Sequence, residues 1–158
     1  MERGVSMKVV SGLFVIALLL LLGAQSLCAI TRHSLVLATG ANSSMPPLTV
    51  QEARKLFLGV PLEKDGERPV PLLNISDPLI FEVFLQKVAF MSANAYENQT
   101  ISVVFRLGGK RPESFNDLKN LVETLQQNPG TITYLWEDQV RAHQGLKSVN
   151  VLWQGALE

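Results

Sequence analysis

Residues 48–59 read Leu48-Thr49-Val50-Gln51-Glu52-Ala53-Arg54-Lys55-Leu56-Phe57-Leu58-Gly59, and this stretch predicts a short amphipathic helix. Thr49 is a good N-cap, and Glu52 three residues later completes a capping box, in which each side chain satisfies a backbone N–H of the other residue. The apolar side chains at 50, 53, 56 and 57 share one face, and Gly59 ends the helix. The helix therefore presents an apolar face that must be buried against another element.

Strand-like and helix-like patterns alternate along the rest of the chain. Apolar runs predict strands at 35–38, 70–75, 131–136 and 149–153. Amphipathic patterns predict further helices at 78–91, 92–104 and 115–125. Strands that alternate with helices pack as an α/β domain, and this length suits one domain. We therefore expect residues 30–158 to form a single α/β lobe, with a central, largely parallel sheet flanked by helices.

Two of these helices carry more detailed expectations. The helix at 115–125 has the clearest apolar face, and Ser114 and Asp117 are interpreted as a second capping box. The helix that begins at Pro78 is capped by Ser76 or Asp77. Its expected apolar stripe consists of Leu79, Val83, Phe84, Val88 and Met91.

The first 29 residues are typical of a secretory signal peptide. Arg3 and Lys8 give a positively charged region before an apolar run at 9–22, and Ala24-Gln25-Ser26 offers small residues where signal peptidase cleaves. We expect cleavage after Ser26, with Ala29 as the competing site. The apolar run is shorter than the roughly 20 residues that span a bilayer comfortably, which favours cleavage over an uncleaved anchor. The mature protein is then periplasmic or secreted, without stable membrane insertion.

The composition argues against several functional classes. The 14 basic and 14 acidic residues balance, which is not the charge pattern of a nucleic-acid-binding protein. Cys28 is the only cysteine, so no intrachain disulfide forms, and His33 and His143 alone do not make a zinc site. No glycine-rich loop of nucleotide-binding spacing opens a helix. We therefore expect no catalytic residue, no metal and no cofactor, and infer that the protein is not an enzyme.

Two phrases in the chain resemble the phosphate-type substrate-binding proteins of bacterial ABC importers. One is the helix end Leu56-Phe57-Leu58-Gly59, and the other is the strand start Asn128-Pro129-Gly130-Thr131-Ile132-Thr133-Tyr134. The similarity in the order of elements covers residues 34–153. Complete members of that family hold their ligand between two lobes, and this chain has room for one. The resemblance therefore implies a short, single-lobe form of the periplasmic-binding-protein domain.

Ser76 is the first candidate for contact with an anion. It lies in Asn74-Ile75-Ser76-Asp77-Pro78, at a strand-to-helix junction where backbone N–H groups and the helix dipole favour phosphate or carboxylate. In the family that the chain resembles, a Ser-Gly-Thr phrase and a nearby arginine help to hold phosphate. Only Ser76 matches that pattern here. The competing interpretation is that Ser76 or Asp77 simply caps its own helix, and an ionised Asp77 would repel an anion.

Arg106 is the second candidate. It begins the basic, glycine-rich loop at 106–112, and a guanidinium can form two hydrogen bonds with one oxyanion. Arg106 can contribute only if this loop folds back toward Ser76. The competing interpretation is a solvated positive loop.

The sequence thus leaves two functions open. One is an exported phosphate ABC transporter substrate-binding-like protein, which binds phosphate or another small oxyanion weakly and without catalysis. The other is an interaction or structural protein of the cell envelope, which reuses a binding-protein lobe without a ligand. The partners expected are a small oxyanion in the first case, and an envelope protein such as a permease or sensor in the second.

Overall fold

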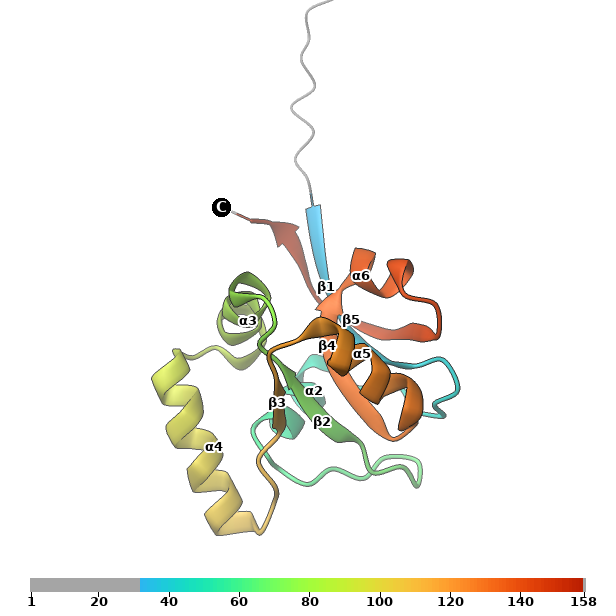
Figure 1. The fold of residues 1–158 in the computed structure, drawn as a ribbon. Coiled ribbons are helices and arrows are strands. Elements are labelled where there is room, and N and C mark those ends of the chain that lie inside the picture. The colour runs from blue at the N-terminus through green and yellow to red at the C-terminus, as the bar shows by residue number, and fades with distance from the viewer. Residues whose placement is uncertain (1–31, 158) are drawn as a thin grey trace, which may run out of the picture. The chain divides into compact units, whose positions relative to one another are not determined.

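The computed structural model describes residues 32–157, which form a five-stranded sheet covered by helices (Figure 1). The strands are β1 (Arg32–Gly40), β2 (Val70–Asn74), β3 (Glu113–Phe115), β4 (Thr131–Trp136) and β5 (Leu146–Ala156). Their order across the sheet is β3-β2-β4-β1-β5. β2 is parallel to β3 and β4, whereas β1 is antiparallel to both β4 and β5. Four strands therefore run in one direction, and β1 alone runs in the other.

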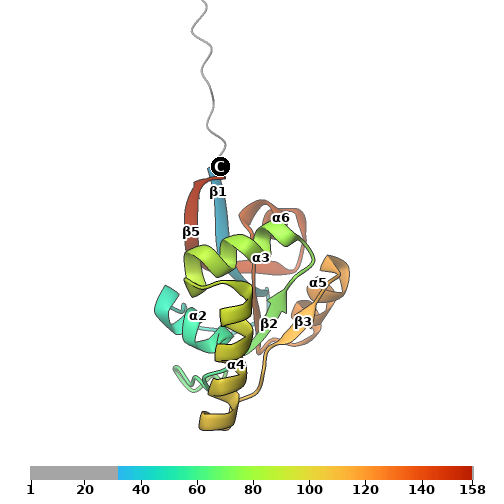
Figure 2. The ribbon, with the colours of Figure 1, turned by 90° about the vertical axis from the view of Figure 1, so that its left-hand side faces the viewer.

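Helices cover both faces of this sheet. One face carries α2 (Val50–Phe57), α3 (Pro78–Phe84), the π-helical turn η1 (Leu85–Ala89) and α4 (Ala93–Leu107). The other carries α5 (Leu118–Gln127) and α6 (Glu137–Ala142). Because successive side chains of a strand point to opposite faces, Leu35 and Leu37 of β1 join the first layer, while Val36 and Ala38 join the second. Figure 2 looks onto the layer that contains α2, α3 and α4.

Three aromatic rings form the centre of the first layer. Phe84 of α3 stacks on Tyr134 of β4 with ring centroids 4.2 Å apart. Phe57 of α2 lies edge-on to both rings, at 5.2 and 5.4 Å. The Tyr96 hydroxyl of α4 donates a hydrogen bond to the Phe57 carbonyl. These contacts hold α2, α3 and α4 against the middle of the sheet. They also fix the position of Tyr134 in β4.

The single α/β lobe predicted from the sequence is confirmed, with a sheet that is mixed because β1 lies antiparallel between β4 and β5. The capping box of α2 is also confirmed. Glu52 N–H donates to the Thr49 hydroxyl at 3.2 Å, and Thr49 N–H donates to the Glu52 carboxylate at 2.7 Å. Gly59 adopts the left-handed conformation after the helix, with φ of 88°.

Two local predictions were wrong. Ser114 and Phe115 lie in the short strand β3, so the helix predicted from Phe115 begins at Leu118. Asp117 alone caps it, through a hydrogen bond from Asn120 N–H at 2.8 Å. Leu79 is 44% exposed, and its neighbour Ile80 is fully buried in the core. The local sequence allowed more than one cap for α5 and more than one buried face for α3. The packing of each helix on the sheet determined which one formed.

The predicted signal peptide, residues 1–29, lies outside the described residues. Among residues 32–157, no helix is both long enough and apolar enough to cross a membrane.

Candidate functional site

The candidate site lies at the edge of the sheet where β2, β3 and β4 end. Because these three strands are parallel neighbours, their carboxyl ends lie at the same edge. α3, α5 and α6 each begin there, directly after β2, β3 and β4 respectively (Figure 1). In α/β sheets this is the edge at which ligands commonly bind.

Asn74, the last residue of β2, organises this edge. It is fully buried, and its side-chain amide donates to the Tyr134 carbonyl at 3.2 Å. Its Oδ1 accepts hydrogen bonds from the Ser76 N–H at 3.0 Å and from the Ser76 hydroxyl at 2.7 Å. The Tyr134 hydroxyl in turn donates to the Asn74 backbone carbonyl at 2.7 Å. One asparagine thus joins the end of β2, the turn that follows it and the neighbouring strand β4.

Tyr134 acts in this network as a neutral donor. Burial raises the pKa of the Tyr134 hydroxyl well above its ordinary value of 10.0, because the phenolate would lose its hydration. The hydroxyl therefore keeps its proton at physiological pH. Its hydrogen bond fixes the backbone at Asn74.

The start of α3 is capped by the chain itself. The Asp77 carboxylate accepts a hydrogen bond from Leu79 N–H at 2.8 Å, and Pro78 has no N–H. Ile75 N–H donates to the Phe115 carbonyl at 2.9 Å, while Ser76 N–H is bonded to Asn74. The N–H groups of residues 75, 76 and 79 are therefore already satisfied within the protein. An anion that uses one of these three N–H groups would have to displace its bond.

Carboxylates also give this edge a negative charge. Asp77 and Asp117 cap α3 and α5, and Glu137 and Asp138 occupy the first turn of α6, where Glu137 is ion-paired with Arg141 at 3.9 Å. Each interacts favourably with the positive end of its own helix dipole. Together they oppose the approach of phosphate.

The structure does not bring the two candidate residues together. Ser76 is half-buried and follows the carboxyl end of β2. Arg106 is exposed in the last turn of α4, where its Nε donates to the Ser102 carbonyl at 3.3 Å. The loop after α4 leads into the amino end of β3 and lies beside Val70 and Pro71, at the start of β2. Arg106 and Ser76 therefore lie toward opposite ends of the parallel strands.

Sequence reasoning missed the roles of Asn74 and Tyr134. The signal for Asn74 was present, because an asparagine whose side chain bonds the backbone two residues later is typical of a turn. The partnership with Tyr134 joins residues 60 positions apart, and no local pattern contains it. Within residues 32–157, no three His, Cys, Asp or Glu side chains are grouped in a way that could hold a metal ion.

No family model matches this chain, and neither does any curated protein. Among solved structures, it is similar to a Clostridium perfringens protein that was solved with bound phosphate and assigned to the phosphate ABC transporter substrate-binding proteins, with a TM-score of 0.56 and 15% identity. It is also similar to PstS from Borrelia burgdorferi, with a TM-score of 0.53 and 12% identity.

These two matches cover 76% and 75% of this chain, but only 45% and 47% of the other proteins. This chain spans less than half of the length of either. The resemblance noted in the sequence is therefore confirmed in the fold: the chain is similar in structure to part of the phosphate ABC transporter substrate-binding proteins.

Proposed function

We propose that this chain is an exported, non-catalytic binding-protein lobe of the phosphate ABC transporter kind, which binds phosphate or another small oxyanion weakly. The observation that carries this proposal is the similarity of its fold to a protein solved with bound phosphate. Ser76 supplies the contact that we expect, with backbone N–H groups at the start of α3 as its neighbours. Arg106 is a second candidate for an oxyanion contact only in a rearranged loop, because its present position is remote from Ser76.

Weak binding follows from three features of the edge. The Ser76 hydroxyl donates to Asn74 and must turn away to reach a ligand. The N–H groups of Ser76 and Leu79 are occupied, and Asp77 adds a negative charge. One lobe also leaves the anion open to water, where each electrostatic contact is weaker than in a closed cleft. We therefore expect a dissociation constant no tighter than about millimolar, which corresponds to roughly 4 kcal/mol at the standard state.

A titration with inorganic phosphate, followed by ¹H–¹⁵N NMR, tests this proposal. The amide signals of residues 75–77, 79 and 80 should shift with about millimolar affinity, and Ser76→Ala should weaken the binding. Ser102→Ala is the matched control, because it removes a hydroxyl from α4 near Arg106. Unchanged binding in Ser76→Ala would contradict the assigned contact. Micromolar binding that requires Ser76 would contradict the expected weakness and indicate a dedicated phosphate receptor.

The export part of the proposal is tested separately by mass spectrometry of the protein recovered from cells. An N-terminus just after Ser26 is the expected result. Recovery of the full-length chain in the membrane fraction would instead support an uncleaved anchor.

One observation favours the second function, an interaction module of the cell envelope. α4 exposes three apolar side chains, Ile101 at 40%, Phe105 at 86% and Leu107 at 57%. Figures 1 and 2 show that this helix extends along the outside of the lobe. A phenylalanine this exposed on a helix is a possible anchor for a protein partner. An envelope protein such as a permease or sensor, with an apolar patch, is the partner that this surface fits.

Site-specific cross-linking in cells separates the two functions. A photoreactive residue at position 105 should capture one discrete partner, whereas the same residue at the exposed Lys119 position of α5 should not. A discrete complex from position 105 combined with no phosphate binding would favour the interaction module. Phosphate binding through Ser76 without a specific complex would favour the binding-protein lobe.

A further inference from the structure

The last turn of α4 exposes apolar side chains on two sides of the helix. Phe105 is 86% exposed and Leu107 is 57% exposed. Residues two positions apart on a helix point in different directions, so these two side chains do not share one face. In Figures 1 and 2 the C-terminal end of α4 lies at the bottom of the lobe, remote from α3. The exposed apolar surface therefore includes the end of the helix as well as its outer side.

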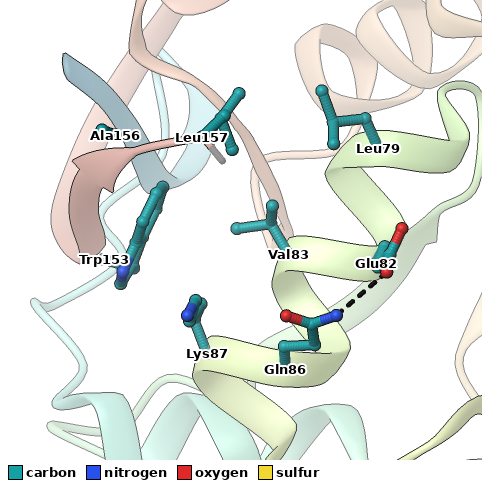
Figure 3. Close-up of a pocket in the computed structure, with 8 residues that line it drawn as sticks. All are labelled: Leu79, Glu82, Val83, Gln86, Lys87, Trp153, Ala156 and Leu157. Atoms are coloured by element: carbon teal, nitrogen blue, oxygen red, sulfur yellow. Dashed lines mark hydrogen bonds between the residues drawn. The ribbon is translucent and has the colours of Figure 1, made fainter. Parts of the chain in front are cut away.

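The ring of Phe105 differs from two other accessible aromatic rings of the lobe. The Arg54 guanidinium lies 5.6 Å from the centroid of the Phe90 ring. The Lys87 Nζ lies 6.0 Å from the centroid of the Trp153 ring, in the hollow between α3–η1 and the end of β5 (Figure 3). Among the described residues, neither a cation nor a second ring lies against Phe105. The lobe itself therefore leaves this ring uncovered.

Positive charge accompanies this apolar end. Arg106 and Lys110 are both exposed, and within the described part of the chain neither has a carboxylate within 4.0 Å. Arg106 uses its Nε for the Ser102 carbonyl of its own helix. The next acidic residue along the chain is Glu113, in β3. We call Phe105, Arg106, Leu107 and Lys110 the α4 tip.

The backbone around the α4 tip is held in place. Gly108 ends the helix in the left-handed conformation, with φ of 66°. The Arg111 guanidinium forms two hydrogen bonds with the Glu97 carboxylate of α4, at 2.6 and 2.5 Å, so the loop folds back along the helix. A Cβ added at Gly109 would collide with the Gly59 carbonyl, so the loop also packs closely on the end of α2. A surface fixed in this way loses little backbone entropy when it binds.

We propose that the α4 tip docks the protein on the surface of an anionic phospholipid bilayer. Phe105 and Leu107 enter the boundary between head groups and acyl chains, and Arg106 and Lys110 pair with lipid phosphates. A bilayer surrounds the end of a helix, which matches apolar exposure on two sides of one turn, whereas a protein groove covers a single helix face. The carboxylates near Ser76 lie toward the other end of the parallel strands and so stay away from the lipid phosphates.

Co-sedimentation of the purified protein with vesicles tests this proposal. Vesicles of equal parts phosphatidylglycerol and phosphatidylcholine should bind it more tightly than pure phosphatidylcholine, and added salt should weaken the binding. Arg106→Gln and Lys110→Gln should each weaken it about five-fold. Phe105→Ser and Leu107→Ser should each weaken it at least about ten-fold, because an apolar side chain no longer leaves water. Lys119→Gln, on the opposite face of the sheet, should have no effect.

Two further measurements make the vesicle experiment specific. Thermal melts should be unchanged in all of these variants, because the substituted side chains are exposed and the fold does not need them. In Phe105→Trp, anionic vesicles should move the tryptophan emission to shorter wavelength beyond the change seen in the natural protein, whereas Lys119→Trp should show no such addition. This signal reports position 105 itself, so it is independent of any lipid binding by the apolar run at 9–22.

Three results would overturn the proposal. These are equal binding to both kinds of vesicle, binding that the serine variants leave unchanged, and an emission at position 105 that does not move. Cross-linking from position 105 to one protein, together with no vesicle binding, would also overturn it and assign this surface to a protein partner. The vesicles contain neither inorganic phosphate nor protein, so the outcome does not depend on either function proposed above.

Discussion

Asn74 shows how a single buried polar side chain can determine the shape of a candidate site. Its side chain donates a hydrogen bond to β4 and accepts one from Ser76 in the following turn. Its backbone carbonyl accepts a hydrogen bond from the Tyr134 hydroxyl. Such a network stabilises the fold only if every member is satisfied, since an unpaired polar group in a buried environment is costly. The hydroxyl of Ser76 is therefore committed to the structure before any ligand arrives.

Tyr134→Phe tests this network. The substitution removes the hydroxyl and leaves the Asn74 carbonyl without that donor, so we expect the free energy of unfolding to fall by about 1–3 kcal/mol. Urea denaturation followed by circular dichroism measures it. A fall of less than about 0.5 kcal/mol would mean that another donor replaces the hydroxyl.

The capping box of α2 makes one part of the stability depend on pH. Hydrogen bonds from Lys64, then from the backbone and side chain of Thr49, lower the pKa of Glu52 from 4.5 to about 2. A lowered pKa in the folded state stabilises the protein above the ordinary pKa, and this contribution is lost as the pH falls toward 2. Glu52→Gln should therefore melt below the natural protein at pH 7, and the difference should shrink between pH 4.5 and 2. A difference that is constant over this range would show that the charge of Glu52 is unimportant.

The face of α5 yields a prediction about packing. Leu121 is fully buried, while Leu118 is half-buried beside the same apolar cluster. Leu121→Ala should lower the free energy of unfolding by about 2–5 kcal/mol, because it removes a side chain and leaves a cavity. Leu118→Ala should cost clearly less. Thermal melts of both variants measure this order, and a larger loss at Leu118 would mean that the helix is rotated from the orientation described here.

Local signals account for the elements that the sequence predicted well. In α2 and α5 the cap and the apolar face lie within a dozen residues of each other. Each helix can therefore be recognised from its own short stretch of sequence. β3 has three residues and α6 has six, which is too short for a periodic pattern to appear. The antiparallel direction of β1 and the distance between Arg106 and Ser76 depend on how distant elements pack. The spacing of residues along the chain predicts neither the direction of β1 nor that distance.

The distribution of charge over the lobe bears most directly on its function. The carboxyl ends of β2, β3 and β4 carry Asp77, Asp117 and Asp138, together with Glu137, which is ion-paired with Arg141. Arg106 and Lys110 lie toward the other end of these strands. A lobe that is similar in fold to phosphate-binding proteins thus places negative charge at the edge where we expect its ligand. We expect these carboxylates to limit the affinity for phosphate more than the absence of Arg106 from the site does.

Asp77→Asn tests the effect of this charge. Asparagine caps helices about as well as aspartate, so α3 should keep its cap while the negative charge beside Ser76 is removed. An exposed unit charge at close range is worth about 1 kcal/mol in water, which corresponds to roughly a five-fold change in affinity. We therefore expect Asp77→Asn to bind inorganic phosphate about five-fold more tightly than the natural chain in the same NMR titration. Asp65→Asn is the matched control, because it removes one charge in the turn before β2, remote from Ser76. If Asp77→Asn leaves phosphate binding unchanged while Ser76→Ala weakens it, the anion is held where Asp77 does not reach, and the occupied N–H groups account for the weakness instead.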